Sequence, residues 1–198
     1  IKCWGTNAYG QLGNGSKVDA AIPVFVSGLA GAVAVSAGNG FSCAIASDAS
    51  VRCWGSNDHG QLGDGTTSDS AVPVTVSGLT NAKAISTGSW HACALLNDGT
   101  VKCWGTNLFG RLGNGSTADS TTPVSVSGLT GAVSISVGTG HSCALLVDTT
   151  IKCWGYNAMG QLGNSTTSDS LTPVTVSGIT GALAVTTGYW HTCALLQS

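Results

Sequence analysis

A repeat of fifty residues runs through the chain without an insertion or a deletion. The tripeptide Cys-Trp-Gly recurs at this interval, as Cys3-Trp4-Gly5, Cys53-Trp54-Gly55, Cys103-Trp104-Gly105 and Cys153-Trp154-Gly155. Self-similarity at a fixed period is typical of repeat architectures, in which each unit buries its apolar face against the next unit. Four units, at about residues 1–50, 51–100, 101–150 and 151–198, fill all 198 residues, so we expect a single repeat domain without a linker.

Each unit has the pattern of short β-strands. Segments such as Val74-Thr75-Val76-Ser77 alternate apolar and polar residues, and no stretch keeps the helical period of about 3.6 residues. Glycines and pairs such as Asn14-Gly15 separate these segments and favour turns. The pattern predicts four strands per unit, in the first unit around Ile1–Gly5, Val24–Val26, Ala32–Ser36 and Ser42–Ala46.

Four short strands at a period near fifty residues are typical of propeller blades. The sequence therefore predicts an all-β fold, a β-propeller of four-stranded antiparallel blades. Pro23 is expected to open the second strand at a sheet edge, where its missing N–H does least harm. The repeated tryptophans are expected to pack between blades, at Trp4, Trp54, Trp104 and Trp154.

One motif in the third unit resembles the regulator-of-chromosome-condensation repeat. It reads Trp104-Gly105-x-Asn107-x-x-Gly110-x-Leu112-Gly113-x-Gly115, then Thr122-Pro123-Val124, then Gly138-x-x-His141-Ser142-Cys143-Ala144-Leu145. The resemblance covers all four units and implies a β-propeller with four-stranded blades. Propellers of this family usually have seven blades, and this chain supplies four. The family's best-known activity is nucleotide exchange on a small GTPase coupled to chromatin binding; the low charge, the paired cysteines and the lack of a loop insertion disfavour it here.

Six of the eight cysteines fall into three pairs ten positions apart, each centred on a turn, and Cys3 and Cys193 are left over. Cysteines that face each other across an antiparallel hairpin have Cβ atoms about 4.5–5.5 Å apart or closer, near the distance that a disulfide needs. We predict the disulfides Cys43–Cys53, Cys93–Cys103, Cys143–Cys153 and, for the remaining pair, Cys193–Cys3. The alternative is eight reduced cysteines in the cytosol. Paired spacing and sparse charge favour an extracellular or secreted protein, with the periplasm or the cell surface as variants.

The strand at Ile1–Gly5 is the one that the last hairpin lacks, because the other units place a turn and a Cys-Trp-Gly strand after it. We expect this terminal strand to close the last blade. Two arrangements satisfy Cys193 and Cys3: closure within one chain, which tethering favours, or donation of the strand to a neighbour, which builds a larger ring or a filament. The sequence leaves both open.

Composition excludes two classes of partner. Charged residues make up 8% of the chain, against about 25% in a typical domain, and the seven Lys and Arg are scattered at a net charge of −2. A nucleic-acid partner needs a basic stripe, so none is expected. No apolar run approaches the ~18 residues of a membrane span, so no membrane insertion is expected. The chain has no initiator Met, and we expect a processed or excised segment.

No residue set predicts catalysis, a metal site or a cofactor, and we expect a non-enzymatic protein. His91, His141 and His191 share a repeated position that Phe41 fills in the first unit, so bonds to backbone at a blade corner are favoured over metal ligation. The loop aspartates are expected to cap turns rather than bind calcium, at Asp19, Asp69, Asp119 and Asp169. There is no Gly-x-Ser-x-Gly elbow and no phosphate loop.

Trp90 and Trp190, with Tyr189, are the candidate ligand-binding residues. They lie in loops where the first and third units have Gly40 and Gly140, and two tryptophans on one face suit a sugar or a protein partner; packing within the loop is the alternative. Candidate N-glycosylation sites are Asn14, Asn114 and Asn164. We predict an extracellular binding or scaffold propeller for a protein or glycan ligand, with a self-assembling subunit joined head to tail as the alternative.

Overall fold

Sixteen β-strands and one short 3-10 helix build the part of the chain that the computed structural model describes, residues 1–197. The strands are β1 (Lys2–Gly5), β2 (Ala20–Phe25), β3 (Ala32–Ala37), β4 (Phe41–Ala46), β5 (Val51–Gly55), β6 (Ser70–Thr75), β7 (Ala82–Thr87), β8 (His91–Leu96), β9 (Val101–Gly105), β10 (Ser120–Ser125), β11 (Ala132–Val137), β12 (His141–Leu146), β13 (Ile151–Gly155), β14 (Ser170–Thr175), β15 (Ala182–Thr187) and β16 (Thr192–Leu196). The helix η1 (Leu108–Gly110) follows β9. In this region no helix has the length and apolar composition needed to cross a membrane.

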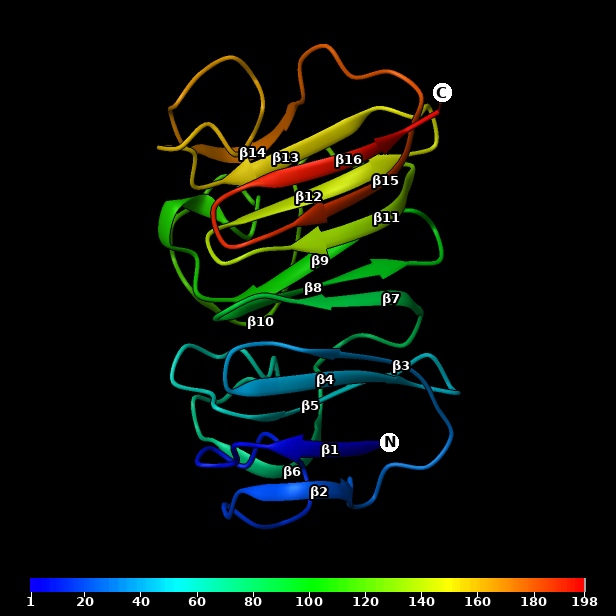
Figure 1. Ribbon diagram of the computed structural model, residues 1–198, viewed down its shortest axis with the longest axis vertical. Helices are drawn as coiled ribbons and strands as arrows, with labels where there is room; N and C mark the ends of the chain where they lie inside the picture. The colour runs from blue at the N-terminus through cyan, green and yellow to red at the C-terminus, as the bar shows by residue number, and fades with distance from the viewer. Residues whose placement is uncertain (198) are drawn as a thin grey trace.

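The strands form three complete four-stranded blades and two half-blades, stacked along the molecule (Figure 1). The complete blades are β3–β6, β7–β10 and β11–β14, all antiparallel, which confirms the predicted fold class. Each takes its first two strands from one sequence unit and its last two from the next. The half-blades, β1–β2 and β15–β16, are therefore the second half and the first half of a blade.

The terminal strand does not close the last blade of its own chain. β1 pairs with β2 and β16 pairs with β15, and the two half-blades lie in opposite halves of the molecule (Figure 1). The expectation of a closed blade is therefore wrong for the single chain. The physical reason is distance, because three complete blades lie between the two half-blades.

Pro23 lies inside β2 and does not open it, so the predicted start of that strand is wrong. β1 and β2 pair Gly5 with Ala20 and Cys3 with Val24, and the register shifts between these pairs. The extra residues of β2, Pro23 among them, lie in this irregular stretch, where a missing N–H breaks no regular ladder. The strand is an edge strand, as predicted.

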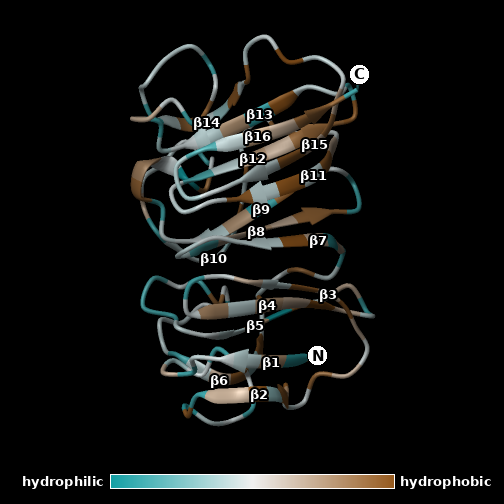
Figure 2. Ribbon diagram, in the orientation of Figure 1, coloured by the Kyte–Doolittle hydropathy of each residue, from teal (hydrophilic) through white to brown (hydrophobic). Residues whose placement is uncertain are grey.

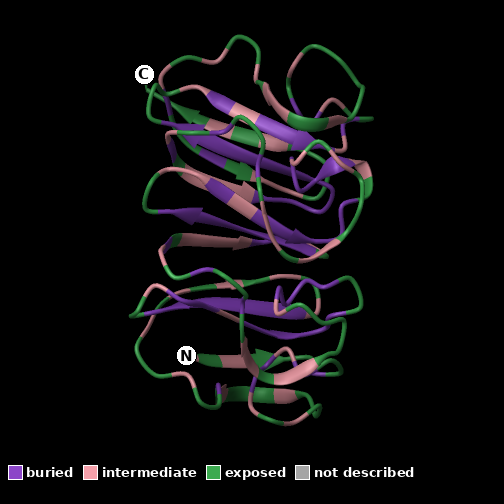
Figure 3. Cartoon of the chain, turned by 180° about the vertical axis from the view of Figure 1, so that it is seen from behind, coloured by how far each residue is buried: buried purple, intermediate pink, exposed green. Residues whose placement is uncertain are grey.

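The second strand of each complete blade forms the core. All residues of β4, β8 and β12 are buried, as the purple strands of Figure 3 show. Small residues such as Ala44 and Ala94 let neighbouring blades approach, while Ile45 and Leu95 fill the space between the blades. Figure 2 shows that β7, β11 and β15, the first strands of three successive sheets, also carry apolar residues.

Three of the four repeated tryptophans pack between blades, as predicted. Trp54, Trp104 and Trp154 are fully buried. Each indole Nε1 donates a 2.9 Å hydrogen bond to a carbonyl oxygen in the loop of the preceding unit, which belongs to Gln11, Gln61 and Arg111 respectively. Trp4 differs, with 64% of its surface exposed, because no preceding loop covers it in the described chain.

Three disulfides join the second and third strands of the complete blades: Cys43–Cys53, Cys93–Cys103 and Cys143–Cys153. The cysteines of each pair lie directly opposite each other in the strand register. Cys3 on β1 and Cys193 on β16 are free, so the fourth predicted disulfide is not formed within the chain. Both free thiols lie on the half-blades.

Candidate ligand-binding face

Two kinds of loop meet on one side of the blades. Short turns join the first and second strands of each blade, and longer loops join the third and fourth strands. Backbone hydrogen bonds connect the two kinds, since the amide of Ser56 donates to Gly40, that of Thr106 to Trp90, and that of Tyr156 to Gly140. We name this side the loop face.

A buried asparagine holds each long loop. In the third unit the Asn107 amide Nδ2 donates to the carbonyl oxygens of Ser116 and Ala118 at 2.9 and 3.0 Å, and its Oδ1 accepts the Leu112 N–H at 2.9 Å. The Asp119 carboxylate accepts the backbone N–H of Asn107 at 2.7 Å. The other units repeat this pattern, so the aspartates close the long loops across twelve residues instead of capping a local turn as predicted.

Four aromatic side chains from three loops form a continuous cluster on the loop face. The ring centroids are 4.7 Å apart for Phe109 and Tyr156, 5.0 Å for Tyr156 and Trp190, and 4.7 Å for Trp190 and Tyr189. Trp190 and Tyr189 keep 41% and 61% of their surface exposed. We name Phe109, Tyr156, Trp190 and Tyr189 the aromatic cluster; it offers ring faces and edges beside phenolic hydroxyls.

The structure brings two of the three predicted ligand residues together. Trp190 and Tyr189 are in contact, whereas Trp90 makes no ring contact within residues 1–197. The third unit has Gly140 where the fourth has Trp190, and the space around Gly140 accounts for the glycine. A Cβ on Gly140 would lie 3.3 Å from the Trp190 ring and 3.1 Å from the Tyr156 Cβ, so a side chain there would crowd the cluster.

Arg111 positions Phe109. At the equivalent site the other units have a glutamine, whose Oε1 accepts the backbone N–H two residues earlier. A guanidinium has no acceptor, and Arg111 Nε instead donates to the carbonyl oxygen of Leu108 at 2.9 Å. Phe109 adopts a φ of +67°, and its ring centroid lies 5.9 Å from the guanidinium carbon. Arg111 Nη1 also donates to the carbonyl oxygen of Thr139 at 3.1 Å, and burial lowers the pKa of the Arg111 guanidinium.

A shallow depression of about 230 Å³ lies beside the aromatic cluster, at the ends of β3, β7, β11 and β15. Its lining includes the hydroxyls of Ser89 and Thr139, which are hydrogen-bonded at 3.1 Å, and the backbone of Gly88 and Gly138. Tyr189 belongs to both the depression and the cluster. The loop face therefore places aromatic rings next to a polar hollow.

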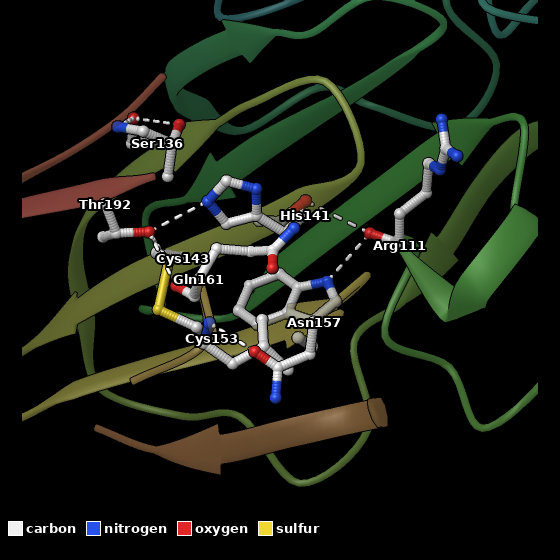
Figure 4. The surroundings of a disulfide bond; sticks show 12 residues. Arg111, Ser136, His141, Cys143, Cys153, Asn157, Gln161 and Thr192 are labelled. Carbon is white, nitrogen blue, oxygen red and sulfur yellow. Dashed lines mark hydrogen bonds between the residues drawn. A yellow bond between two sulfur atoms is a disulfide. The ribbon is translucent and has the colours of Figure 1, made fainter. Parts of the chain in front are cut away.

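The repeated histidines connect neighbouring blades, and their partners differ from the predicted ones. His91 Nε2 is 2.9 Å from the Ser142 hydroxyl, and His141 Nε2 is 2.9 Å from that of Thr192 (Figure 4). The expected bonds to backbone are therefore replaced by bonds to side-chain hydroxyls of the next blade. Burial lowers the pKa of His91 well below its usual value and that of His141 to about 4, with smaller contributions from Arg111 and His141 to the first and from His191 to the second.

Phe41 takes the histidine position in the first unit because its neighbour has no hydroxyl. The residue that faces it in the next blade is Ala92, and both lie in one apolar cluster. The two positions therefore vary together between neighbouring units.

The remaining sequence candidates lie on the long loops. Asn14, Asn114 and Asn164 are half-buried, and their side-chain oxygens lie 3.2–3.4 Å from the amide nitrogens of the loop asparagines. Their glycosylation stays a prediction. Within residues 1–197 no three His, Cys, Asp or Glu side chains gather as metal ligands would.

Sequence reasoning missed Phe109, Tyr156 and Arg111. The signal that points to them is departure from the repeat: Arg111 replaces a glutamine, and Tyr156 stands where the other units have Thr6, Ser56 and Thr106. In a strict repeat, such departures mark positions where one unit does something that the others do not.

The fold and the loop face together define a class of protein: a row of propeller blades, each complete blade with an internal disulfide, that presents ordered loops on one side. The sequence matches the regulator of chromosome condensation (RCC1) repeat over residues 3–45, 48–95, 98–145 and 153–195. A second description of the repeat matches residues 32–61, 82–111 and 132–161. The chain therefore belongs to the RCC1 repeat family. No curated protein matches it by sequence.

Solved structures agree with this assignment. Human WBSCR16 is similar over 100% of this chain and 52% of its own, with 26% identity and a TM-score of 0.86. Prp20p from Saccharomyces cerevisiae, whose structure is described with its binding to Gsp1p and histones, is similar over 99% and 51%, with 23% identity and a TM-score of 0.83. The ectodomain of the Physcomitrella patens receptor kinase CR4 is similar over 84% and 38%, with 26% identity and a TM-score of 0.53. This chain thus spans about half the length of the first two structures.

Proposed function

We propose that the protein is a non-enzymatic binding or scaffold module whose ligand meets the loop face at the aromatic cluster. The single observation that carries the proposal is the contact of Phe109, Tyr156, Trp190 and Tyr189 in one partly exposed row. Large aromatic side chains give contact area at low entropic cost and are enriched where proteins bind partners.

The loops that carry the cluster are ordered before a ligand arrives. Asn107 and Asn157 are fully buried and hold the long loops that carry Phe109 and Tyr156, respectively, through several hydrogen bonds each. Binding to such a face needs little further ordering, which favours affinity.

The chemistry of the face favours a neutral ligand, either a glycan or a segment of a protein. Aromatic rings stack on the apolar faces of sugars, and the hydroxyls of Ser89 and Thr139 in the neighbouring depression suit polar groups of such a ligand. The Arg111 cation is buried, so it adds no charge to the surface of the cluster.

The test is a screen of immobilised neutral oligosaccharides, followed by fluorescence titration with the best binder. Tyr156→Ala interrupts the cluster in its middle and is expected to weaken binding about 10–100-fold, the usual range for a hot-spot residue. Trp90→Ala is the matched control, because Trp90 has the same exposed fraction as Trp190 but lies outside the cluster. Equal affinities of the two variants would remove the cluster as the binding site, and binding of no oligosaccharide would leave the protein ligand.

An extracellular location is part of the proposal. Disulfides persist in oxidising compartments, and the three blades each contain one. Mapping of disulfides in protein from the native source tests it, since free thiols at Cys43 and Cys53 would contradict it. Binding to a partner such as Gsp1p or to histones, as described for Prp20p, is disfavoured because only seven Lys and Arg are spread over the chain.

Self-assembly is the second candidate function. The observation that favours it is the pair of half-blades, since β1 and β16 each have one edge that no strand within residues 1–197 pairs. Subunits joined through these edges would form a head-to-tail series.

A further inference from the structure

The chain contains three Asn-Gly pairs, at Asn14-Gly15, Asn39-Gly40 and Asn114-Gly115. Asparagine before glycine is prone to deamidation, because glycine has no Cβ to keep its amide nitrogen away from the asparagine side chain. The three pairs differ in how the fold holds the glycine amide that would attack.

Deamidation needs a free glycine amide. Its nitrogen attacks the asparagine Cγ, the amide proton passes through solvent to the departing side-chain nitrogen, and ammonia leaves. Water then opens the cyclic succinimide at either carbonyl group, which gives aspartate or isoaspartate. One water is taken up and one ammonia released, with no change of oxidation state. A hydrogen bond that the glycine N–H donates must therefore break before the reaction starts.

Two of the pairs lie in long loops, where the next blade holds the glycine amide. The Gly15 N–H donates to the carbonyl oxygen of Ala71 and the Gly115 N–H to that of Leu171, each at 2.9 Å. Ala71 and Leu171 belong to β6 and β14, the last strands of the neighbouring blades. These two amides therefore stay bonded as long as the blades stay packed.

The asparagine side chains of these two pairs are held as well. Asn14 Oδ1 and Asn114 Oδ1 accept the backbone N–H of Ser16 and Ser116, respectively, at 3.1 Å. The same oxygens lie 3.4 and 3.2 Å from the amide nitrogens of the buried loop asparagines. Any movement of the side chain toward the glycine nitrogen breaks these bonds too.

The third pair lies in the turn between β3 and β4, and no such contact holds it. Within residues 1–197 the Gly40 N–H has no hydrogen-bond acceptor. Asn39 is exposed, and its side chain makes no hydrogen bond in that part of the chain. The attacking amide and the side chain that it attacks are both free.

The free amide is a property of the turn in every complete blade. The turns of the second and third complete blades have strands of other blades on both sides, and the amides at the same position, of Trp90 and Gly140, have no acceptor within residues 1–197 either. Water reaches this turn, since Trp90 keeps 41% of its surface exposed. A blade packed on either side therefore leaves the amide free.

We propose that Asn39 is a site of spontaneous deamidation, whereas the packing of the blades protects Asn14 and Asn114. Asn39 lines the depression on the loop face, and no charged side chain of the described residues lines it. Aspartate at this position places a carboxylate in the depression, and isoaspartate also lengthens the backbone of the turn by one methylene group. The loop face thus gains a negative charge as the protein ages, whichever ligand it binds.

The first experiment follows the three pairs in one sample of the wild-type chain. The protein is kept at neutral pH and body temperature and digested at mildly acidic pH, and mass spectrometry quantifies aspartate and isoaspartate at each pair. We expect Asn39 to react at least about 10-fold faster than Asn14 and Asn114, the effect of a local opening that costs about 1.4 kcal/mol. Equal rates at the three pairs would overturn the proposal.

The unfolded chain is the matched control. In guanidinium chloride with the disulfides reduced, no blade contact exists, and we expect the three pairs to react at similar rates. Phe41 follows the third pair, whereas a serine follows each of the other two. A preference for Asn39 that persists in the unfolded chain would come from this local sequence and would overturn the role of packing.

Amide hydrogen exchange of the native protein tests the cause directly. We expect the Gly40 amide to exchange at least about 10-fold faster than the amides of Gly15 and Gly115, because only the latter two are bonded to a neighbouring blade. Equal protection of the three amides would overturn the proposed cause.

The last experiment loosens one protecting contact at a time. A Cβ on Gly110 would lie 2.6 Å from the Leu171 Cα, and a Cβ on Gly10 would lie 2.5 Å from the Ala71 Cα. Gly110→Ala is therefore expected to speed deamidation of Asn114 and to leave Asn14 in the same molecule unchanged. Gly10→Ala is the reciprocal variant and should speed only Asn14. An unchanged rate at the pair beside each substitution would contradict protection by the blade contact.

Discussion

Arg111 Nε donates a hydrogen bond to the carbonyl oxygen of Leu108 at 2.9 Å, and this bond reverses the polarity that the other three units use. A glutamine oxygen at that site accepts the N–H two residues earlier, whereas an arginine donates and therefore turns the preceding carbonyl toward itself. The result is a left-handed backbone at Phe109, which costs on the order of 1 kcal/mol for a residue other than glycine. One substitution in the repeat thus places one member of the aromatic cluster.

Arg111→Gln is expected to restore the common loop. The glutamine oxygen would accept the Phe109 N–H, Phe109 would leave the left-handed region, and its ring would move away from Tyr156. Chemical shifts and a crystal structure of the variant check this. The reciprocal change, Gln61→Arg, is the matched control and should drive His59 to a positive φ; if neither loop changed, residue 111 would not set the backbone.

Acid is expected to destabilise the protein through its buried histidines. His141 has a pKa lowered from 6.5 to about 4, and His91 has one well below 6.5, because both are buried. Between pH 6.5 and 4 the unfolded chain binds these protons and the folded chain does not, so the free energy of unfolding falls as the pH falls. For His141 alone the loss approaches about 3 kcal/mol below pH 4, at 1.36 kcal/mol for each pKa unit.

Urea unfolding at pH 7 and at pH 4.5 measures this loss. The double variant His141→Phe/Thr192→Ala copies the Phe41–Ala92 pair of the first unit and should show a smaller difference between the two pH values. The hydroxyls of Ser50, Thr100 and Thr150 hold the carboxyl pKa of Asp48, Asp98 and Asp148 below its usual value, so these groups stay ionised in the window. An unchanged pH dependence in the double variant would contradict the assignment to His141.

Removal of one blade disulfide is expected to lower stability without changing the fold. The Cys93–Cys103 bond closes a loop of ten residues, for which restriction of the unfolded chain gives about 2–3 kcal/mol. Cys93→Ala/Cys103→Ala therefore should unfold at lower urea with a circular dichroism spectrum like that of the wild type. The double change Cys3→Ala/Cys193→Ala is the control, since those thiols are free; an equal loss in the control would contradict a specific role of the bond.

The buried asparagines are expected to be the most sensitive polar positions in the loops. Asn107→Ala leaves the Leu112 N–H and the carbonyl oxygens of Ser116 and Ala118 without their partner. The buried Leu112 N–H costs about 1–3 kcal/mol when unpaired, while the carbonyl oxygens belong to a half-buried and an exposed residue and cost less. Denaturation should show a loss of at least about 1 kcal/mol, with faster hydrogen exchange confined to the third long loop. Asn39→Ala, at an exposed asparagine, is the control and should change little.

Strand number, blade architecture and the three disulfides within the complete blades could be predicted from the sequence because they repeat, whereas the predicted Cys193–Cys3 bond is not formed within the chain. Cys43 and Cys53 recur at one spacing, and the strand register places them opposite each other as the hairpin geometry requires. The position of Pro23 could not be predicted, since the register shift between β1 and β2 depends on how the edge strand bends.

The candidate site was predicted in part. Trp190 was found because it stands where the first and third units have glycine, and Tyr189 was found beside it, but Phe109 and Tyr156 come from loops that are distant in sequence. Their contact depends on how one blade is placed against the next, which no local pattern contains. The hydroxyl partners of His91 and His141 were missed for the same reason. Each histidine and its partner are 51 residues apart in sequence and meet only because neighbouring blades pack together.

The stagger between sequence unit and blade has an evolutionary consequence. Because every complete blade takes its first two strands from one unit and its last two from the following one, each blade disulfide joins two consecutive units. Duplication or loss of a gene segment of any whole number of units would therefore change the number of blades while every cysteine of a complete blade keeps a partner in the neighbouring unit. Copy number is then free to drift without leaving a thiol unpaired between two units.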